Sequence, residues 1–313
     1  MTVADRAEVE QALAGDFDDS ALKALAVPPR PYSRIRGSEP SVTTVLGMLP
    51  KPGLPWGAAR ETAVFAVLHP EKWQHLPENE AIEVLRKHHR GIWDGRAAAG
   101  SFVHGVNDGY GKGLSFTADD LAAIVDNVIE TERDARTWKE RDRDELLEEL
   151  FGYVLGAEQW WADFRPTNVR TEVVVRWPGL YIGQTDLRCT IDGVDTLVDW
   201  KTTAKQDDGD GIYCDSWTLQ LAMYGMARET VSYEIQEDRK LRSGSRVVES
   251  ATGEWSQPER YMVVHLRGDE AYTAFDIPVT RSVQRTAVRL ARAYAGWKAI
   301  PEKPAVIRKG RVA

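Results

Sequence analysis

The chain has 313 residues, of which 42% are hydrophobic and 28% are charged, as expected for a globular protein with a substantial core. Its 48 acidic residues outnumber its 40 basic residues, and the net charge of −8 argues against a protein that coats nucleic acid through bulk charge. Because only Cys189 and Cys214 are present, a four-cysteine zinc site or iron–sulfur cluster within the chain is excluded.

The N-terminal stretch "MTVADRAEVEQALAGD" is acidic and lacks the apolar core of a signal peptide. No apolar run approaches the roughly 18 residues that a membrane helix needs. We therefore expect a protein that is neither exported nor bound in a membrane, and the sparse cysteines favour a reducing cytoplasm.

Residues 1–40 include the proline- and arginine-rich stretch "VPPRPYSRIRGSEP", and we expect them to form a peripheral arm. The composition becomes helical over residues 40–69. A further helix is expected around residues 94–107, where several glycines close it.

Two more helices are predicted before the composition changes. Thr117 and Asp120 have the spacing of a capping box at the start of a helix over residues 118–135. The next helix covers residues 144–164 and is expected to stop before Pro166, because the residue before a proline disfavours the helical conformation.

Three β-rich runs follow, over residues 170–177, 180–191 and 195–203. The dipeptides Pro178-Gly179 and Asp192-Gly193 separate them, and both are strong turn signals. We therefore predict an antiparallel meander of three strands.

The last third of the chain mixes both kinds of element. A helix is predicted over residues 217–229, and the polar residues 234–257 form either a long loop or an extended hairpin. Two strands over residues 260–268 and 272–279 and a final helix over residues 281–300 complete the chain. This order predicts an α/β protein: behind the arm, one domain over residues 41–313, with a helical cap (about 41–165) and an α/β core (about 166–300).

Asp186 and Asp199 lie on neighbouring predicted strands and are expected at the same level if residues 192 and 193 form the turn. Opposed carboxylates repel one another unless a positive charge lies between them, and a divalent cation with oxygen ligands would supply that charge. Lys201 shares a strand face with Asp199, while Trp200 turns to the core. Alone, the acid-x-lysine pair is typical of a surface ion pair; with Asp186 it favours a metal site.

Four further residues are ambiguous when the pair on one helix and the other two are each considered alone. Gln220 and Tyr224 share one helix face, and they either pack against the core or contact a phosphate backbone. His104 is a lone helix histidine, which is more often packed or exposed than a ligand. Glu172 begins the meander and carries the same ambiguity.

Taken together and in order, these residues resemble the RecB-like exonuclease branch of the PD-(D/E)XK nuclease superfamily, in its phage-type form. That branch carries a G-[ST]-x-x-H helix, a strand glutamate, a G-x-x-D strand, a [DE]-x-K strand and a Q-x-x-x-Y helix. The corresponding residues here are Gly100-Ser101-Phe102-Val103-His104, Glu172, Gly183-Gln184-Thr185-Asp186, Asp199-Trp200-Lys201 and Gln220-Leu221-Ala222-Met223-Tyr224. The match spans about residues 40–300, without the cluster cysteines or the helicase P-loop of some relatives.

The resemblance implies a restriction-endonuclease-like core, in which helices flank a central mixed sheet that contains the meander. It also implies Mg²⁺ or Mn²⁺ as the cofactor and no iron–sulfur cluster. The implied metal ligands are His104, Asp186, Asp199 and the carbonyl of Trp200, and an imidazole ligand favours Mn²⁺.

The remaining site residues have implied roles as well. Lys201 would orient the attacking water, and Glu172 would hold the metal through water or position Lys201. Gln220 and Tyr224 would grip the scissile strand or brace the site.

The function implied is a metal-dependent exonuclease of linear DNA, acting in recombination or DNA processing in the cytoplasm of a bacterium or a phage-infected host. The alternatives are a non-catalytic DNA-binding module that acts as a recombination partner on the same fold, and an endonuclease. A recombination protein partner, a homo-oligomer and no membrane partner are expected.

Local positive charge would have to hold the DNA. The candidates are Arg188, Lys205, residues 238–246 and the helix face of Arg281, Arg285, Arg289 and Arg292, which could equally be a solvated surface. Trp160 and Trp161 could stack on bases, but packing of their helix against the sheet is favoured.

Overall fold

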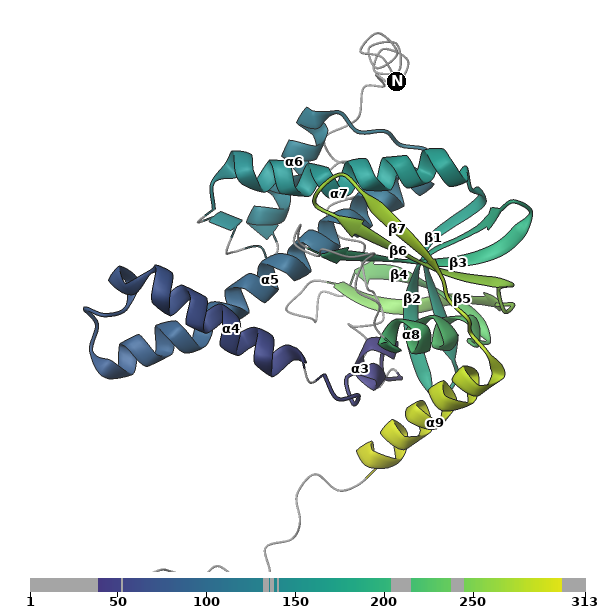
Figure 1. The fold of residues 1–313 in the computed structure, drawn as a ribbon. Helices are drawn as coiled ribbons and strands as arrows, with labels where there is room; N and C mark the ends of the chain where they lie inside the picture. The colour runs from purple at the N-terminus through teal and green to yellow at the C-terminus, as the bar shows by residue number, and fades with distance from the viewer. Residues whose placement is uncertain are drawn as a thin grey trace, which may run out of the picture.

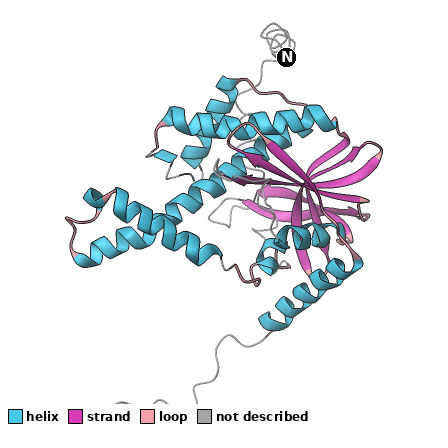
Figure 2. Ribbon diagram, viewed as in Figure 1, coloured by secondary structure: helices cyan, strands magenta, loops and turns pink. Residues whose placement is uncertain are grey.

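A computed structural model describes residues 39–51, 53–131, 135, 138–139, 141–203, 215–237 and 245–299. In this part of the chain the fold is α/β: helices come first along the sequence, and a seven-stranded mixed sheet follows with two more helices (Figures 1 and 2). All of the predicted arm except residues 39 and 40 lies outside the described residues. Among the described helices, none has the length and apolar character needed to cross a membrane.

The helical half contains α3 (Val42–Leu46), α4 (Gly53–Leu68), the short 3-10 helix η2 (Pro70–Lys72), α5 (Glu78–Gly111), α6 (Ala118–Thr131) and α7 (Arg143–Phe164). The helix predicted over residues 94–107 is only the second half of α5, which has 34 residues. The first half continues because Glu83 pairs with Arg86 at 2.8 Å and with Lys87 at 3.1 Å, contacts that support a helix locally despite the glycines further on.

The predicted start of α6 and the predicted end of α7 are confirmed, whereas α6, expected to reach residue 135, ends at Thr131 among the described residues. The Thr117 backbone N–H donates to the Asp120 carboxylate at 2.8 Å, and the Asp120 N–H donates to the Thr117 hydroxyl at 3.2 Å, which is a reciprocal capping box. Helix α7 ends at Phe164, and Arg165 takes the left-handed conformation (φ 43°) directly before Pro166.

The sheet order is β5-β4-β1-β2-β3-β6-β7. Its strands are β1 (Thr167–Trp177), β2 (Tyr181–Ile191), β3 (Val194–Thr203), β4 (Glu229–Glu237), β5 (Ser245–Glu254), β6 (Arg260–Arg267) and β7 (Tyr272–Asp276). Strand β3 pairs in parallel with β6, and all other pairs are antiparallel.

The predicted meander is confirmed as β1–β2–β3. Its turns form at the expected dipeptides because Gly179 (φ 73°), Asp192 (φ 53°) and Gly193 (φ 80°) adopt the positive φ values that tight hairpins require. Of the two alternatives for residues 234–257, the structure has the extended hairpin, β4–β5; its tip lies outside the described residues.

Helix α8 (Asp215–Gly225) is shorter than predicted, and α9 (Arg281–Lys298) matches the prediction closely. Residue 229 was expected in the helix but begins β4, because Glu229 pairs with Arg176 of β1 at 2.6 Å and joins the sheet ladder. Such a contact between distant segments overrides local helix propensity.

Among the described residues, the two larger hydrophobic cores lie on the two sides of the sheet. Helices α5, α6 and α7 bury residues such as Trp160 against Trp200, whereas α3, α8 and α9 bury residues such as Tyr224 near Leu197. The hairpin of α4 with the first half of α5 projects away from both layers (Figure 1). Its helix α4 exposes large apolar side chains, with Trp56 at 79% and Val67 at 76% exposure.

Candidate functional site

A buried aspartate docks the end of α5 on the sheet. The Asp108 carboxylate accepts a hydrogen bond from the Thr171 hydroxyl on β1 and contacts the Lys112 ammonium at 2.6 Å. His104 lies one helical turn before Asp108 on the same face. The docking contact therefore brings His104 to the strand beside Thr171, where Glu172 follows.

Glu172 interrupts the regular backbone of β1. Its φ is 51°, and the β1–β2 register pairs Thr171 with Leu187 and Val173 with Thr185 while omitting the intervening pair of Glu172 with Asp186. A non-glycine residue at positive φ inside a strand costs roughly 1–3 kcal/mol and persists only where its surroundings impose it. Here the Gln184 amide donates to the Glu172 carboxylate at 2.6 Å and holds the side chain in place.

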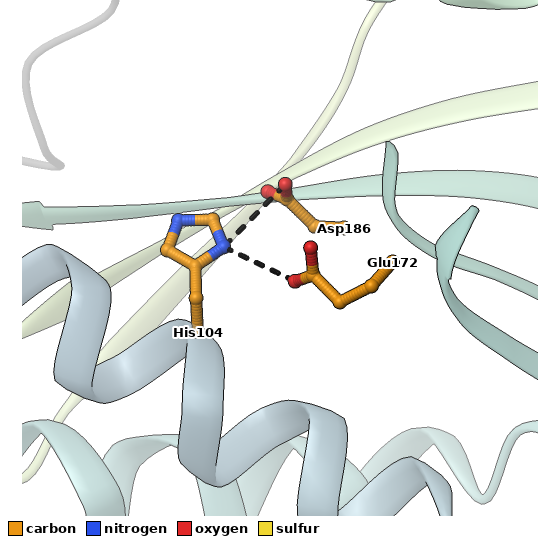
Figure 3. Close-up of side chains that lie close together, drawn as sticks. All are labelled: His104, Glu172 and Asp186. Carbon is orange, nitrogen blue, oxygen red and sulfur yellow. Dashed lines mark ion pairs between the residues drawn. The ribbon is translucent and has the colours of Figure 1, made fainter. Parts of the chain in front are cut away.

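His104, Glu172 and Asp186 converge from α5, β1 and β2 (Figure 3). The Nδ1 atom of His104 lies 3.4 Å from Oδ1 of Asp186 and 3.8 Å from Oε1 of Glu172. One ligand atom from each of the three residues lies within 4.8 Å of the others. The three side chains are 23%, 16% and 9% exposed in that order, so the cluster is mostly withdrawn from solvent.

The second oxygen of Asp186 fixes the relation between β2 and β3. The hydrogen-bonded register of these strands ends at the pair Leu187–Val198, one position before Asp186 and Asp199. Beyond it, the Trp200 backbone N–H donates to Oδ2 of Asp186 at 2.8 Å, so a carboxylate satisfies a buried donor that the ladder no longer reaches. The prediction that Asp186 and Asp199 lie at one level is confirmed.

Asp199 has a different set of contacts from the cluster. It is 1% exposed, its Oδ2 contacts the Lys201 ammonium, and its Oδ1 accepts a hydrogen bond of 2.9 Å from the Gln220 amide. Gln220 also donates to the Tyr224 hydroxyl at 3.1 Å, so α8 holds the acid in place from its own layer.

Burial and charge together perturb the pKa values of the site. Burial raises the pKa of Asp199 to about 6; Lys201 opposes that shift and Asp186 adds to it. Burial also raises the pKa of Asp186, against the opposing charges of His104 and Lys201. Burial by itself would lower the pKa of His104, but Asp186 and Glu172 outweigh it and the net shift is upward. The site thus concentrates carboxylates in a poorly solvated space, where added positive charge is favourable.

These residues fit a divalent cation. One imidazole and two carboxylates supply oxygen and nitrogen donors that Mg²⁺ and, with better tolerance of nitrogen, Mn²⁺ accept. The buried Oε1 atom of Gln184 has no hydrogen-bond partner among the described residues, and a buried polar atom in that condition indicates a ligand or water at the site. Among the described side chains, His104, Glu172 and Asp186 form the group with metal-ligand spacing.

The structure brings together all of the predicted site residues, with two differences in arrangement. Glu172 reaches the cluster directly, whereas Asp199 is engaged by Lys201 and Gln220 and does not belong to the group of three. Trp200 buries its side chain in the core as predicted, with its ring 4.9 Å from that of Trp160. Its carbonyl as a metal ligand stays a prediction.

The candidates for DNA contact differ in their exposure to solvent. Arg188 is 3% exposed, donates to Asp195 at 2.9 Å and to the Ser256 carbonyl at 2.8 Å, and stacks 4.3 Å from the Trp255 ring centre, so its expected role as a surface DNA contact is wrong. Burial in β2 gives this arginine a structural role. Lys205 and residues 238–244 lie outside the described residues.

Packing, rather than base stacking, is confirmed for the tryptophan pair on α7. Trp160 is fully buried. The Trp161 indole N–H donates to the Asn107 side chain at 2.9 Å, which joins α7 to α5.

One contributor to the site, Gln184, and one buried histidine on the strand beside β3, His265, were not predicted. Gln184 stands two residues before Asp186, so the period-two pattern of a strand contained the signal that both side chains point the same way. His265 is buried on β6, pairs with Lys201 in the sheet register and lies 2.8 Å from the Thr203 hydroxyl. No local signal identifies His265, because the β3–β6 pairing joins segments more than 60 residues apart.

No protein-family model matches this chain, and no curated protein sequence matches it. Among solved structures, it is similar to one described as "Crystal structure of SSO0001", with 16% identity over 64% of this chain and 86% of that chain. The TM-score of that pair is 0.26, and a likeness at that level carries no argument about function.

Proposed function

We propose that this protein is a metal-dependent DNA exonuclease with a restriction-endonuclease-like core. The observation that carries the proposal is the position of one cluster beside one ion pair: His104, Glu172 and Asp186 converge next to the buried Asp199–Lys201 contact. Phosphodiester hydrolysis can use both parts, since a cation offsets charge on the phosphate and a cationic side chain helps to place the nucleophile.

The order of elements supports the finer assignment of the fold. An antiparallel meander, β1–β2–β3, carries Glu172, Asp186, Asp199 and Lys201, and α8 then leads by way of the β4–β5 hairpin to a strand that pairs in parallel with β3. This arrangement agrees with the mixed sheet that the resemblance implies.

The proposed cation is Mg²⁺ or Mn²⁺, held by His104, Glu172 and Asp186. When bound, it would offset the carboxylate charges and stabilise negative charge that develops on a phosphate oxygen. Gln184 keeps Glu172 aimed at the cluster, and the Trp200 backbone N–H keeps Asp186 in place.

Lys201 is the residue proposed to orient the attacking water and to stabilise charge on the phosphate. Its ammonium contacts Asp199, and the Gln220 amide fixes that carboxylate from the other side. Tyr224 lies buried beneath Gln220, which supports bracing of the site over a grip on the scissile strand.

The biological setting extends the same proposal. Linear DNA is the proposed substrate, and recombination or DNA processing in the cytoplasm of a bacterium or a phage-infected host is the proposed role. A recombination partner or a homo-oligomer is consistent with the exposed apolar side chains of α4, among them Trp56, Val67 and Leu68.

The decisive experiment is digestion of end-labelled linear DNA and of covalently closed circular DNA with Mg²⁺, Mn²⁺ or EDTA. An exonuclease releases nucleotides from linear DNA when Mg²⁺ or Mn²⁺ is present but not in EDTA, and it leaves circular DNA intact. An endonuclease cuts the circular DNA as well. DNA binding without cleavage in any divalent ion supports the non-catalytic module.

Lys201→Ala should abolish cleavage while the circular dichroism spectrum is kept, and the exposed Lys87→Ala should retain wild-type activity; wild-type activity in Lys201→Ala refutes the proposal.

A further inference from the structure

The last helix presents a row of arginines to solvent. The row lies opposite the buried residues Ala287, Ala291 and Tyr294, with which α9 packs on the second core. Its members recur every three or four residues along one face of the helix: Arg281, Arg285, Arg289 and Arg292.

The same arginines line a shallow groove at the junction of α8 and α9, with a volume of about 610 Å³. We call it the α9 groove, and its lining residues are Met226, Arg281, Gln284, Arg285, Val288, Arg289 and Arg292. Met226 follows the end of α8 and stands six residues, roughly 9 Å of helical rise, after Gln220 of the candidate site.

Charge in the α9 groove is not balanced within the described structure. The helix from Arg281 to Lys298 contains no acidic residue, although acids outnumber bases in the chain. No ion pair joins any of the four groove arginines to a described acidic side chain.

Such a row weakens the helix that carries it. Like charges four residues apart repel, as at Arg281, Arg285 and Arg289, and Arg281 lies at the positive end of the helix dipole. The four side chains are exposed and have no ion-pair partner among the described residues, so a ligand that supplies negative charge would offset their repulsion.

The chemistry of the row favours a chain of phosphates. A guanidinium fork binds phosphate through two parallel hydrogen bonds, and four forks over twelve residues span roughly 16 Å of helix, more than one small anion can cover. Val288 and Met226 add an apolar patch to the lining, which suits the sugar and base faces of a strand better than an acidic peptide.

We propose that the α9 groove binds the phosphate backbone of a DNA strand outside the metal cluster and so lengthens the DNA footprint of the site. The identity of the ligand rests on the proposed function, but its binding does not depend on cleavage. Because each neutralised phosphate releases condensed counterions, binding through the groove must depend on salt.

The test measures fluorescence anisotropy of labelled single-stranded and double-stranded oligonucleotides in EDTA, at several salt concentrations. Arg285→Gln/Arg289→Gln should weaken DNA binding about tenfold and lower the slope of log K against log salt by roughly 1.4–1.8, the amount for two lost phosphate contacts. Arg285→Lys/Arg289→Lys keeps the charges and should largely keep the slope. The matched control is Arg60→Gln/Arg90→Gln, which removes the same charge from exposed positions on α4 and α5 and should bind as wild type.

Wild-type affinity and salt slope in Arg285→Gln/Arg289→Gln overturn the inference. So does groove-dependent binding to phosphatidylserine vesicles or polyglutamate in place of DNA. The outcomes for the two proposals separate: groove-dependent DNA binding by a wild-type protein that cleaves nothing sustains the inference and refutes the nuclease. Metal-dependent cleavage with DNA binding unchanged in the groove variants sustains the nuclease and refutes the inference.

Discussion

The ring of Tyr224 lies against the bare backbone of Gly183, where a Cβ atom would come within 2.5 Å of the ring atom Cε1. Glycine at this position lets α8 approach β2 closely. Gln220 is one turn earlier on α8 and therefore reaches Asp199. The G-x-x-D strand and the Q-x-x-x-Y helix are thus two sides of one packing contact.

Gly183→Ala should destabilise the protein by about 1–3 kcal/mol, because the added methyl group forces Tyr224 or the backbone to move. Chemical denaturation followed by circular dichroism measures the loss. Gly296→Ala is the matched control, since a Cβ at Gly296 on α9 meets nothing within 4 Å. A double-mutant cycle with Tyr224→Leu should show coupling, and strictly additive effects would contradict the contact.

Asp199→Asn should stabilise the metal-free protein at pH 7.5. Burial raises the folded-state pKa of Asp199 to about 6 from 3.8, so the folded protein binds more protons than the unfolded chain, and stability falls as the pH rises from 4 to above 6. Asparagine resembles the protonated acid and removes that loss, worth on the order of 2–3 kcal/mol at about 1.4 kcal/mol for each pKa unit. The free energy of unfolding against pH in EDTA tests it; a wild-type curve that is flat between pH 4 and 6.5 would be the contrary result.

His104→Gln should weaken Mn²⁺ binding at least tenfold, measured by isothermal titration calorimetry without DNA. The neutral imidazole is the ligand form, and the neighbouring carboxylates raise the pKa of His104 above its ordinary value of 6.5. Wild-type affinity should therefore fall as the pH is lowered through that raised pKa, and binding should release a proton. His75→Gln, at an exposed histidine, is the control. Unchanged affinity and proton release in His104→Gln would exclude the imidazole as a ligand.

Gln184→Leu should lower Mn²⁺ affinity about 10- to 100-fold, the usual effect of removing a group that orients a metal ligand. The substitution deletes the 2.6 Å hydrogen bond to Glu172 and leaves that carboxylate free to turn away. Calorimetry measures the change, with Gln74→Leu at an exposed position as the control. Equal affinities for wild type and Gln184→Leu would remove Gln184 from the site.

Trp160→Ala should lower the free energy of unfolding by about 3–5 kcal/mol, as for other large aromatic residues removed from a core. The exposed Trp56→Ala should change it little. If Trp160 only packs α7 on the sheet, DNA binding by the folded variant at low temperature should equal that of wild type. A selective loss of DNA binding with normal stability would instead favour base stacking.

Features that depend on neighbouring residues were predictable from the sequence. The turn between β2 and β3 follows from Asp192 and Gly193, because these residue types favour the positive φ values that the turn requires. The capping box of α6 needs only Thr117 and Asp120, three residues apart. The pairing level of Asp186 and Asp199 follows from counting back from that turn.

Features that depend on contacts between distant segments were not predictable in the same way. The left-handed backbone of Glu172 is imposed by Gln184 and by the approach of α5, and it brings Glu172, instead of Asp199, into the cluster. Arg188 looked like a surface cation because its neighbours in sequence do not reveal Trp255 and Asp195 closing over it.

The sequence by itself determined the kind and order of most elements, since strand alternation, helix spacing and turn chemistry act over a few residues, and the resemblance carried by its ordered motifs implied which residues meet at the site. Only the tertiary structure decided which carboxylate joins His104, which arginines are buried and which face solvent on α9. Those outcomes depend on burial and on the closure of long loops, whose free energies belong to the whole fold and not to any local stretch of chain.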